Sequence, residues 1–224
     1  QLALRQVTDR FIYLEEGDLV RITPTSLEIM TSAGERVERR MTQISALEET
    51  TGLGDYEHYM LKEIHEQPRA LANTIPVAGT RDIDDSVFGS EAGALFDQVR
   101  AVQIVACGTS YHAGMVARYW LEELAGLPCT VEVASEFRYR KRVPLPGTLL
   151  VTVSQSGETA DTLAALRDAT EEAYIGSLVI ANVDHSSLVR ESDLVFLTRA
   201  GAEIGVASTK AFTTQLAAFL MLTR

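Results

Sequence analysis

The stretch Val151-Thr152-Val153-Ser154-Gln155-Ser156-Gly157-Glu158-Thr159 joins a short apolar run to a cluster of small polar residues. Helix-forming residues follow at 160–167, so the pattern predicts a strand, a turn and a helix. At such a junction the first backbone N–H groups of the helix are unpaired and the positive end of its dipole faces the turn, which favours an anion. The turn adds neutral donors from four side chains, those of Ser154, Gln155, Ser156 and Thr159. Such a site can hold a phosphate group.

A second unit of the same kind lies upstream. Residues 102–106 are an apolar strand candidate, Cys107-Gly108-Thr109-Ser110 is a small polar turn, and residues 111–124 carry a helical period. In a doubly wound parallel sheet, neighbouring turns at the carboxyl ends of the strands converge on a crevice where ligands bind. The two hydroxyl-rich turns therefore predict one site between them.

Strands and helices alternate through the second half of the chain, which predicts an α/β fold with a parallel sheet. Further strands are expected at 129–134, 148–153, 177–182 and 194–197, and helices at 110–125, 159–173 and 208–223.

The loop at residues 201–210 is expected to close the site. Ser208 is predicted to cap the helix that follows, and its hydroxyl could also reach a ligand together with the backbone of Val206 and Ala207. Glu203 and Lys210 are expected to pair with each other or to face solvent, and a direct chemical role for either also stays open.

The first half of the chain has a different pattern. Residues 10–41 alternate as a β-meander of three or four strands, and residues 50–55 form a polar, glycine-containing connector. A helix is predicted over residues 57–67, stopped by Pro68, followed by a short helix over 69–75, a loop over 76–90 and a helical segment over 91–99. Four apolar residues of the first helix are expected to face inward, namely Tyr59, Met60, Leu61 and Ile64.

Composition limits the function. The 224 residues carry a formal net charge of −11, which argues against nucleic acid or an anionic membrane as the main partner. The basic segment 137–142 is therefore expected to be solvated or to face another subunit. No apolar run reaches the roughly 18 residues of a membrane span, and no signal-peptide pattern begins the chain, so a cytoplasmic location is expected.

Metal and cofactor motifs are missing from the sequence. There is no CxxC pair, and His58 and His65 lack a third ligand, so no metal site is expected. Cys107 and Cys129 are expected to be free thiols; Cys107 lies at the proposed site, where a reactive role and a packing role both stay open. No GxGxxG, P-loop or GxSxG motif is present, so a dinucleotide, an ATP-type site and a serine hydrolase are disfavoured and no cofactor is expected.

Several separated blocks of the chain resemble one enzyme family. The blocks are residues 107–111, 134–140, 154–162 and 205–215, with 59–64 and 66–68 ahead of them. They closely resemble the glutamine–fructose-6-phosphate aminotransferases, the glucosamine-6-phosphate synthases. The resemblance implies a sugar isomerase (SIS) domain, a flavodoxin-like three-layer α/β/α sandwich.

The resemblance also implies a domain order. Residues 1–46 look like the end of a glutaminase domain, 47–56 like a linker and 57–224 like the first of two SIS domains. The family's nucleophilic cysteine, acid-base glutamate, ring-opening histidine and imine-forming lysine match no position here. The chain is therefore expected to bind fructose 6-phosphate or glucosamine 6-phosphate without catalysing a reaction alone, and to belong to a homodimer.

By position, the resemblance implies a set of ligand contacts. The phosphate contacts would be Ser110, Ser154, Gln155, Ser156 and Thr159, with Thr109 beside them, and the sugar contacts Val206 and Ser208. Two other interpretations stay open. One is a sugar-phosphate-sensing regulator, which should carry a basic helix-turn-helix where the pattern of residues 10–41 predicts strands. The other is a purely structural domain whose hydroxyls only cap helices.

Overall fold

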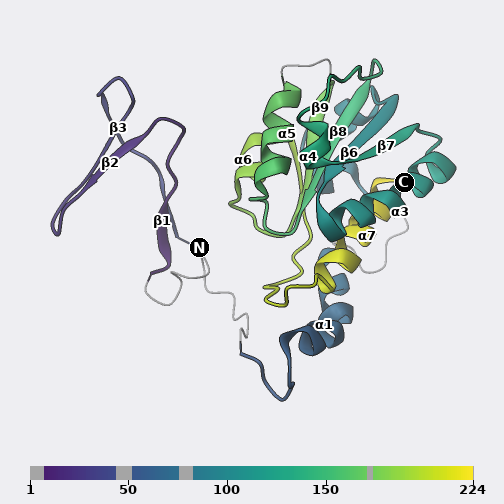
Figure 1. The fold of residues 1–224 in the computed structure, drawn as a ribbon, viewed down its shortest axis with the longest axis horizontal. Helices are drawn as coiled ribbons and strands as arrows, with labels where there is room; N and C mark the ends of the chain where they lie inside the picture. The colour runs from purple at the N-terminus through teal and green to yellow at the C-terminus, as the bar shows by residue number, and fades with distance from the viewer. Residues whose placement is uncertain (1–7, 44–51, 76–82, 171–173, 224) are drawn as a thin grey trace. The chain divides into compact units, whose positions relative to one another are not determined.

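The computed structural model describes residues 8–43, 52–75, 83–170 and 174–223. The chain divides into two compact units, residues 1–50 and residues 51–224, and each is described by itself. Figure 1 shows the elements of both.

The first unit is built from short antiparallel strands. β1 (Arg10–Ile12) pairs with β5 (Met41–Gln43), while β2 (Leu19–Ile22), β3 (Leu27–Met30) and β4 (Arg36–Val37) form a second sheet in that order. The expected meander is confirmed by the three-stranded sheet β2-β3-β4, whereas β1 pairs with β5 in a separate two-stranded sheet instead of joining it. An ion pair joins Arg39 to Asp18, with both guanidinium–carboxylate distances at 2.9 Å. This contact, with the Glu15 N–H, lowers the Asp18 pKa from 3.8 to about 2.

A five-stranded parallel sheet forms the centre of the second unit. Its strands are β6 (Ala101–Ala106), β7 (Cys129–Val133), β8 (Thr148–Ser154), β9 (Gly176–Ala181) and β10 (Leu194–Leu197). They lie in the order β10-β9-β8-β6-β7, so the predicted doubly wound sheet is confirmed. Every residue of β6 and β8 is buried, as expected for central strands covered on both faces.

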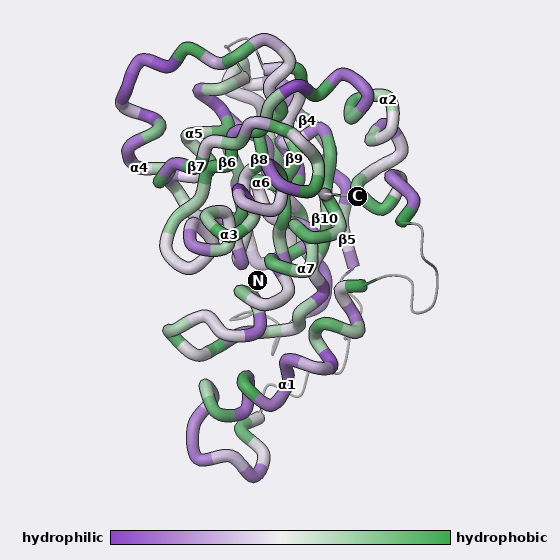
Figure 2. The backbone as a smooth tube through the Cα atoms, turned by 90° about the vertical axis from the view of Figure 1, so that its right-hand side faces the viewer, coloured by the Kyte–Doolittle hydropathy of each residue, from purple (hydrophilic) through white to green (hydrophobic). Residues whose placement is uncertain are grey.

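Helices cover both faces of this sheet. α3 (Gly108–Leu124) and α7 (Lys210–Leu222) pack on one face, where the larger apolar core lies. α4 (Ala134–Phe137), α5 (Ala160–Thr170) and α6 (Ser187–Glu191) cover the other face over a second core (Figure 1). The apolar composition of α7, which packs against α3 and against α1 (Tyr59–Thr74), is visible in Figure 2.

The helix α1 differs from its prediction. It continues through Pro68 to Thr74 as one helix instead of stopping and restarting. Proline leaves the carbonyl of residue i−4 without its usual backbone donor, and here the Gln67 side-chain amide donates to that Ile64 oxygen at 3.0 Å. A neighbouring side chain thus offsets part of the cost of the proline.

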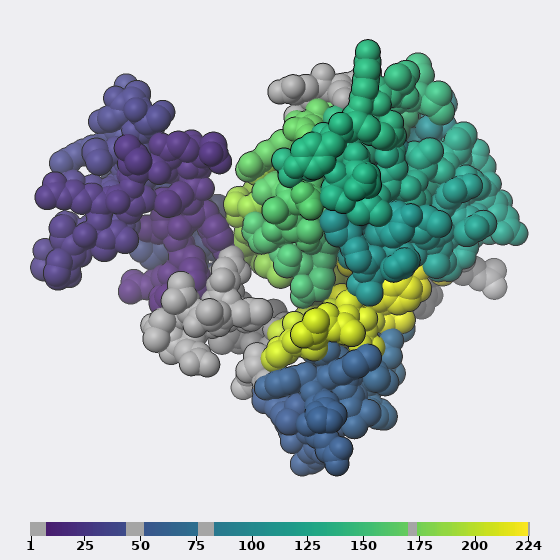
Figure 3. Space-filling model, in the orientation of Figure 1, coloured from purple at the N-terminus to yellow at the C-terminus, as the bar shows by residue number. Residues whose placement is uncertain are grey.

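The buried face of α1 was also predicted wrongly. Met60, Leu61 and Ile64 are each at least 40% exposed, whereas Glu63 and Ala70 are buried. α1 contacts α7 in part through polar side chains, such as Glu66 with Lys210, and Figure 3 shows the two helices in contact.

The remaining elements are short. A 3-10 turn, η2 (Asp85–Phe88), lies inside the expected loop, and α2 (Ala92–Phe96) forms the expected helical segment. α4 and α6 have no counterpart in the prediction, because four or five residues are too few to show a helical period. The expected extension of α5 over 171–173 and the loop residues 76–82 lie outside the described residues.

Candidate functional site

The two hydroxyl-rich turns leave adjacent strands. β6 and β8 are parallel neighbours, and Ala106 pairs in register with Val153. The next residues are Cys107 and Ser154, so both turns begin at the same carboxyl edge. Chain order reverses between these two strands, since β7 lies outward of β6 on one side and β9 and β10 lie outward of β8 on the other. Ligands bind at such a switch point in open α/β sheets.

A direct side-chain contact joins the two turns across this position. The Thr162 hydroxyl, in the first turn of α5, lies 3.9 Å from the Cys107 sulfur. α3 and α5 then run to opposite faces of the sheet. Their N-termini therefore flank the edge between β6 and β8 from the two sides.

The turn after β8 is organised by its own hydroxyls. The buried Ser154 Oγ accepts a hydrogen bond from the Gly157 N–H at 3.0 Å and lies 2.9 Å from the Thr159 hydroxyl. The Ser156 Oγ accepts from the Glu158 N–H at 3.2 Å. Gln155 and Ser156 are half-buried, so their polar groups stay accessible from solvent. This turn is preformed.

The turn after β6 is more open. Gly108 has φ of +57°, a left-handed conformation that glycine adopts without strain, and α3 starts there. Thr109 is exposed, and Ser110 is buried in the first turn of α3. Within the part of the chain that the structure describes, the Ser110 hydroxyl makes no hydrogen bond. It is thus a donor still available to a ligand.

Contacts beyond the turns hold the β8 turn in place. The Leu188 N–H donates to the Gly157 oxygen at 3.1 Å, and Glu158 accepts from the Ser187 N–H at 2.8 Å. Asn182, just after β9, donates its backbone N–H to Gln155 O and its side-chain amide to Gly201 O. The β8 turn is therefore linked to the segment that follows β10. No periodic or motif signal in the sequence pointed to this role of Asn182.

The loop before α7 is held by two carboxylates. Glu203 Oε1 accepts from the N–H groups of Thr209 and Ala211, and its Oε2 accepts from the Ser208 hydroxyl at 2.9 Å. The N-terminus of α7 is thus capped by Glu203, and the prediction that Ser208 caps it is wrong: the N-cap residue is Thr209, and the Ser208 hydroxyl is directed to Glu203. A carboxylate suits this place because it also complements the helix dipole.

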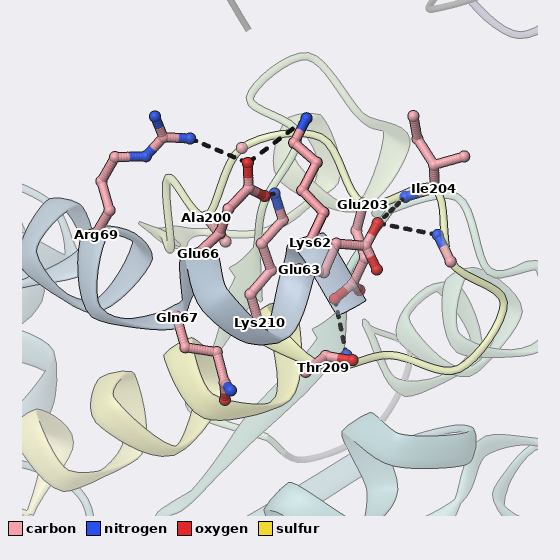
Figure 4. Close-up of polar contacts among 12 residues, drawn as sticks. Lys62, Glu63, Glu66, Gln67, Arg69, Ala200, Glu203, Ile204, Thr209 and Lys210 are labelled. Atoms are coloured by element: carbon pink, nitrogen blue, oxygen red, sulfur yellow. Dashed lines mark hydrogen bonds and ion pairs between the residues drawn. The ribbon is translucent and has the colours of Figure 1, made fainter. Parts of the chain in front are cut away.

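The second carboxylate comes from α1. Glu63 is only 2% exposed, and its Oε1 accepts from the N–H groups of Ile204 and Gly205 at 2.6 and 2.9 Å (Figure 4). Sequence reasoning missed Glu63, because a single glutamate in an amphipathic helix is usually solvated. The buried face of α1, which carries Glu63 and Ala70, is rotated from the expected one, and this explains the miss.

Lys210 is paired, but not with Glu203. Its Nζ lies 2.7 Å from Glu66 Oε2 and its side chain is 4% exposed, so the expected pairing with Glu203 or exposure to solvent is wrong. Glu66 also lies near Lys62 and Arg69 (Figure 4). Lys210 therefore anchors α7 on α1.

The predicted sugar contacts lie on this loop. Val206 is fully exposed and Ser208 is half-buried. The segment starts from the carboxyl end of β10, on the same edge as the two turns. The hydrogen bonds found for residues 203–209 go to α1, to the first turn of α7 and within the segment itself, and none found among the described residues joins it to the turns.

The family profile of the SIS domain matches residues 95–224, more than half of the chain. This chain belongs to the SIS domain family. The match includes both turns, the five-stranded sheet and the loop before α7.

The SIS domain has relatives of high similarity. The chain is 63% identical over all 224 residues to a glutamine–fructose-6-phosphate aminotransferase (isomerizing) of Pseudomonas syringae pv. tomato, and 61% identical to the same-named protein of Pseudomonas aeruginosa. It spans 37% of the length of each. Among solved structures, the C-terminal domain of glucosamine-fructose-6-phosphate aminotransferase from Francisella tularensis matches with a TM-score of 0.75 and 56% identity, over 77% of this chain and 49% of that one.

Neither cysteine of the SIS domain is in a disulfide. Cys129 is buried, and burial raises the pKa of its thiol to about 12, so it is an inert packing residue. Cys107 is half-buried between the turns. Within the described residues no group of three or more His, Cys, Asp or Glu side chains could hold a metal ion, and no helix is long and apolar enough to span a membrane.

The arginines of the basic segment 137–142 make contacts within the SIS domain. Arg138 lies 3.0 Å from Asp161, Arg140 pairs with Glu132, and Arg142 stacks on Phe137 with its guanidinium carbon 4.1 Å from the ring centroid. These contacts pair much of its charge with groups of the same domain.

Proposed function

We propose that this SIS domain binds the phosphate group of fructose 6-phosphate or glucosamine 6-phosphate, as part of a glutamine–fructose-6-phosphate aminotransferase (isomerizing). That enzyme would make glucosamine 6-phosphate and glutamate from fructose 6-phosphate and glutamine. The observation that carries the proposal is the register of Ala106 with Val153, which sets two hydroxyl-rich turns side by side at the switch point. The identity of 58–63% to relatives of that name gives independent support.

The proposed phosphate contacts come from both turns. Ser110 offers a hydroxyl that is not used within the described protein, and Gln155 and Ser156 are accessible on the other side. Thr109 lies beside Ser110. Ser154 and Thr159 are bonded to each other, so one proton of the pair stays available to a phosphate oxygen. Val206 and Ser208 would contact the sugar from the loop before α7.

The chemical task of these residues is to anchor the substrate rather than to react. Neutral donors and two helix N-termini hold a phosphate dianion, and binding energy far from the reacting carbons fixes the orientation of the open-chain sugar. Proton transfer between the sugar carbons needs an acid-base group. We place that group, and the amine that forms an imine with the sugar, in a second SIS domain of the whole enzyme, so residues 1–224 alone would bind without turnover.

The rest of the proposal concerns the whole protein. Residues 1–46 would end a glutaminase domain, 47–56 would be a linker and 57–224 the first SIS domain, in a cytoplasmic homodimer. The sensor alternative has less support: residues 10–43 contain five strands where a regulator would carry a helix-turn-helix.

Calorimetric titration tests the proposal. The chain should bind fructose 6-phosphate and should bind unphosphorylated fructose far more weakly. Ser110→Ala and Ser156→Ala should each weaken fructose 6-phosphate binding by about three- to tenfold, the usual range for one lost hydrogen bond. Ser90→Ala is the matched control, because Ser90 is exposed and follows Gly89, which lies against Leu194 at the amino end of β10. Equal affinity for the two sugars would refute a phosphate-anchored site.

A further inference from the structure

The Ser208 hydroxyl is held in one hydrogen-bonding orientation. A serine hydroxyl has one proton, and this proton is donated to Glu203 Oε2 at 2.9 Å. Glu203 holds the bond firmly, because its other oxygen accepts two backbone N–H groups from the start of α7. Ser208 can therefore offer only oxygen lone pairs to anything that approaches it.

The backbone that carries Ser208 is fixed from the other side. Glu63, from α1, accepts from the N–H groups of Ile204 and Gly205, and Figure 4 shows its carboxylate aimed at the loop. A Cβ on Gly205 would lie 2.6 Å from Glu63 Oε2, so a larger residue there would displace the carboxylate. The segment between the two carboxylates is Val206, Ala207 and Ser208.

We propose that Glu203 is a positioning residue that sets Ser208 as a hydrogen-bond acceptor for a sugar hydroxyl, so that this loop recognises the sugar and rejects the phosphate. This inference rests on the proposed function. A phosphate oxygen is an acceptor, and facing it with the Ser208 lone pairs would be repulsive. A sugar hydroxyl has a proton that it can donate to those lone pairs, and therefore fits. The two turns thus bind the phosphate end of the ligand with hydrogen-bond donors, and the loop binds the sugar end with a hydrogen-bond acceptor.

Glu203→Gln reverses this polarity with little change of shape. The remaining carbonyl oxygen would keep the N–H groups of Thr209 and Ala211, which leaves the new amide NH₂ facing Ser208. The Ser208 oxygen would then accept from that amide, and its proton would turn to the ligand. Fructose 6-phosphate should bind about three- to tenfold more weakly, while inorganic phosphate should bind as before.

A double-mutant cycle separates positioning from capping. Ser208→Ala should also weaken fructose 6-phosphate binding by about three- to tenfold without affecting phosphate. If Glu203 acts through Ser208, then Glu203→Gln should cost nothing more on the Ser208→Ala background. Glu122→Gln is the matched control, because Glu122 lies on the exposed side of α3, paired with Arg118. Thermal unfolding of each variant checks that α7 keeps its stability.

The outcomes are distinct. Additive losses in the cycle, or unchanged binding of fructose 6-phosphate by either single variant, overturn the inference and leave the proposed function standing. A parent chain that binds neither fructose 6-phosphate nor inorganic phosphate overturns the proposed function, and the inference with it. If Glu203→Gln does not fold, Ser208→Ala tests whether the loop recognises the sugar and not the phosphate: a lowered ratio of fructose 6-phosphate to phosphate affinity supports the inference, and an unchanged ratio overturns it.

Discussion

The backbone of Gly157 lies directly against the side chain of Ser186. A Cβ at residue 157 would be 1.9 Å from the Ser186 oxygen and 2.4 Å from its Cβ, and Gly157 has φ of +66°. The β8 turn and the start of α6 are therefore packed together at a distance that only glycine allows.

Gly157→Ala should accordingly destabilise the second unit by about 2–4 kcal/mol. The left-handed φ costs an alanine about 1 kcal/mol, and the forced displacement of Ser186 adds about 1–3 kcal/mol of overpacking. Urea unfolding measures the difference. Gly126→Ala is the matched control, with φ of +67° and nothing within 4 Å of the added carbon. Equal losses for the two variants would mean that the contact with Ser186 is unimportant.

The pairing of Glu66 with Lys210 predicts a dependence of stability on pH. Burial alone would raise the pKa of the Glu66 carboxyl, but Lys210, Lys62 and Arg69 together lower it below its ordinary 4.5. The unfolded chain then binds more protons than the folded one near that pH. The contribution to stability is complete above pH 4.5 and is lost as the pH falls through the lower folded pKa.

Glu66→Gln should flatten this acid-side loss and destabilise the second unit at neutral pH, because Lys210 would stay buried without its anion. Lys210→Met should cost less, since it leaves Glu66 beside two cations and packs an apolar chain in the same space. Unfolding curves between about pH 3 and pH 7 test both statements. If Glu66→Gln loses as much stability at acid pH as the parent chain does, the loss comes from other carboxyl groups.

The hydrogen bonds that Glu63 accepts predict how fast the backbone amides of the loop before α7 exchange with solvent. Glu63→Gln keeps an acceptor for Ile204 and Gly205, whereas Glu63→Ala removes it. Amide hydrogen exchange at residues 204 and 205 should therefore speed up strongly in Glu63→Ala and weakly in Glu63→Gln. Gly205→Ala should behave like Glu63→Ala, because its Cβ would displace the carboxylate. Unchanged exchange in Glu63→Ala would show that the loop is held by Glu203 alone.

The sheet was predicted well because its signals are local. Runs such as residues 101–106 and 148–154 are largely apolar, and glycine and hydroxyl residues mark where they end. The doubly wound arrangement also followed, since right-handed crossovers leave few topologies. Parallel register then brought Cys107 and Ser154 together without any long-range information.

Tertiary contacts account for the errors. Pro68 stays inside a helix, where the Gln67 side chain offsets part of its cost, and the α7 cap is a glutamate six residues before the N-cap rather than the adjacent serine. The buried face of α1 was misjudged because Glu63 and Glu66 are satisfied by the loop and by Lys210, partners more than 140 residues away. The local pattern of apolar and polar residues carries no information about these long-range contacts.

Amide chemical shifts during titration test the central claim most directly, because they report on both turns in one experiment. Fructose 6-phosphate should move the signals of Gly108, Ser110, Ser156 and Gly157 together with one affinity, and fructose should leave them in place. Inorganic phosphate should move the same signals without affecting Ser208. Shifts confined to one turn, or equal shifts with fructose, would contradict a phosphate site shared by the ends of β6 and β8.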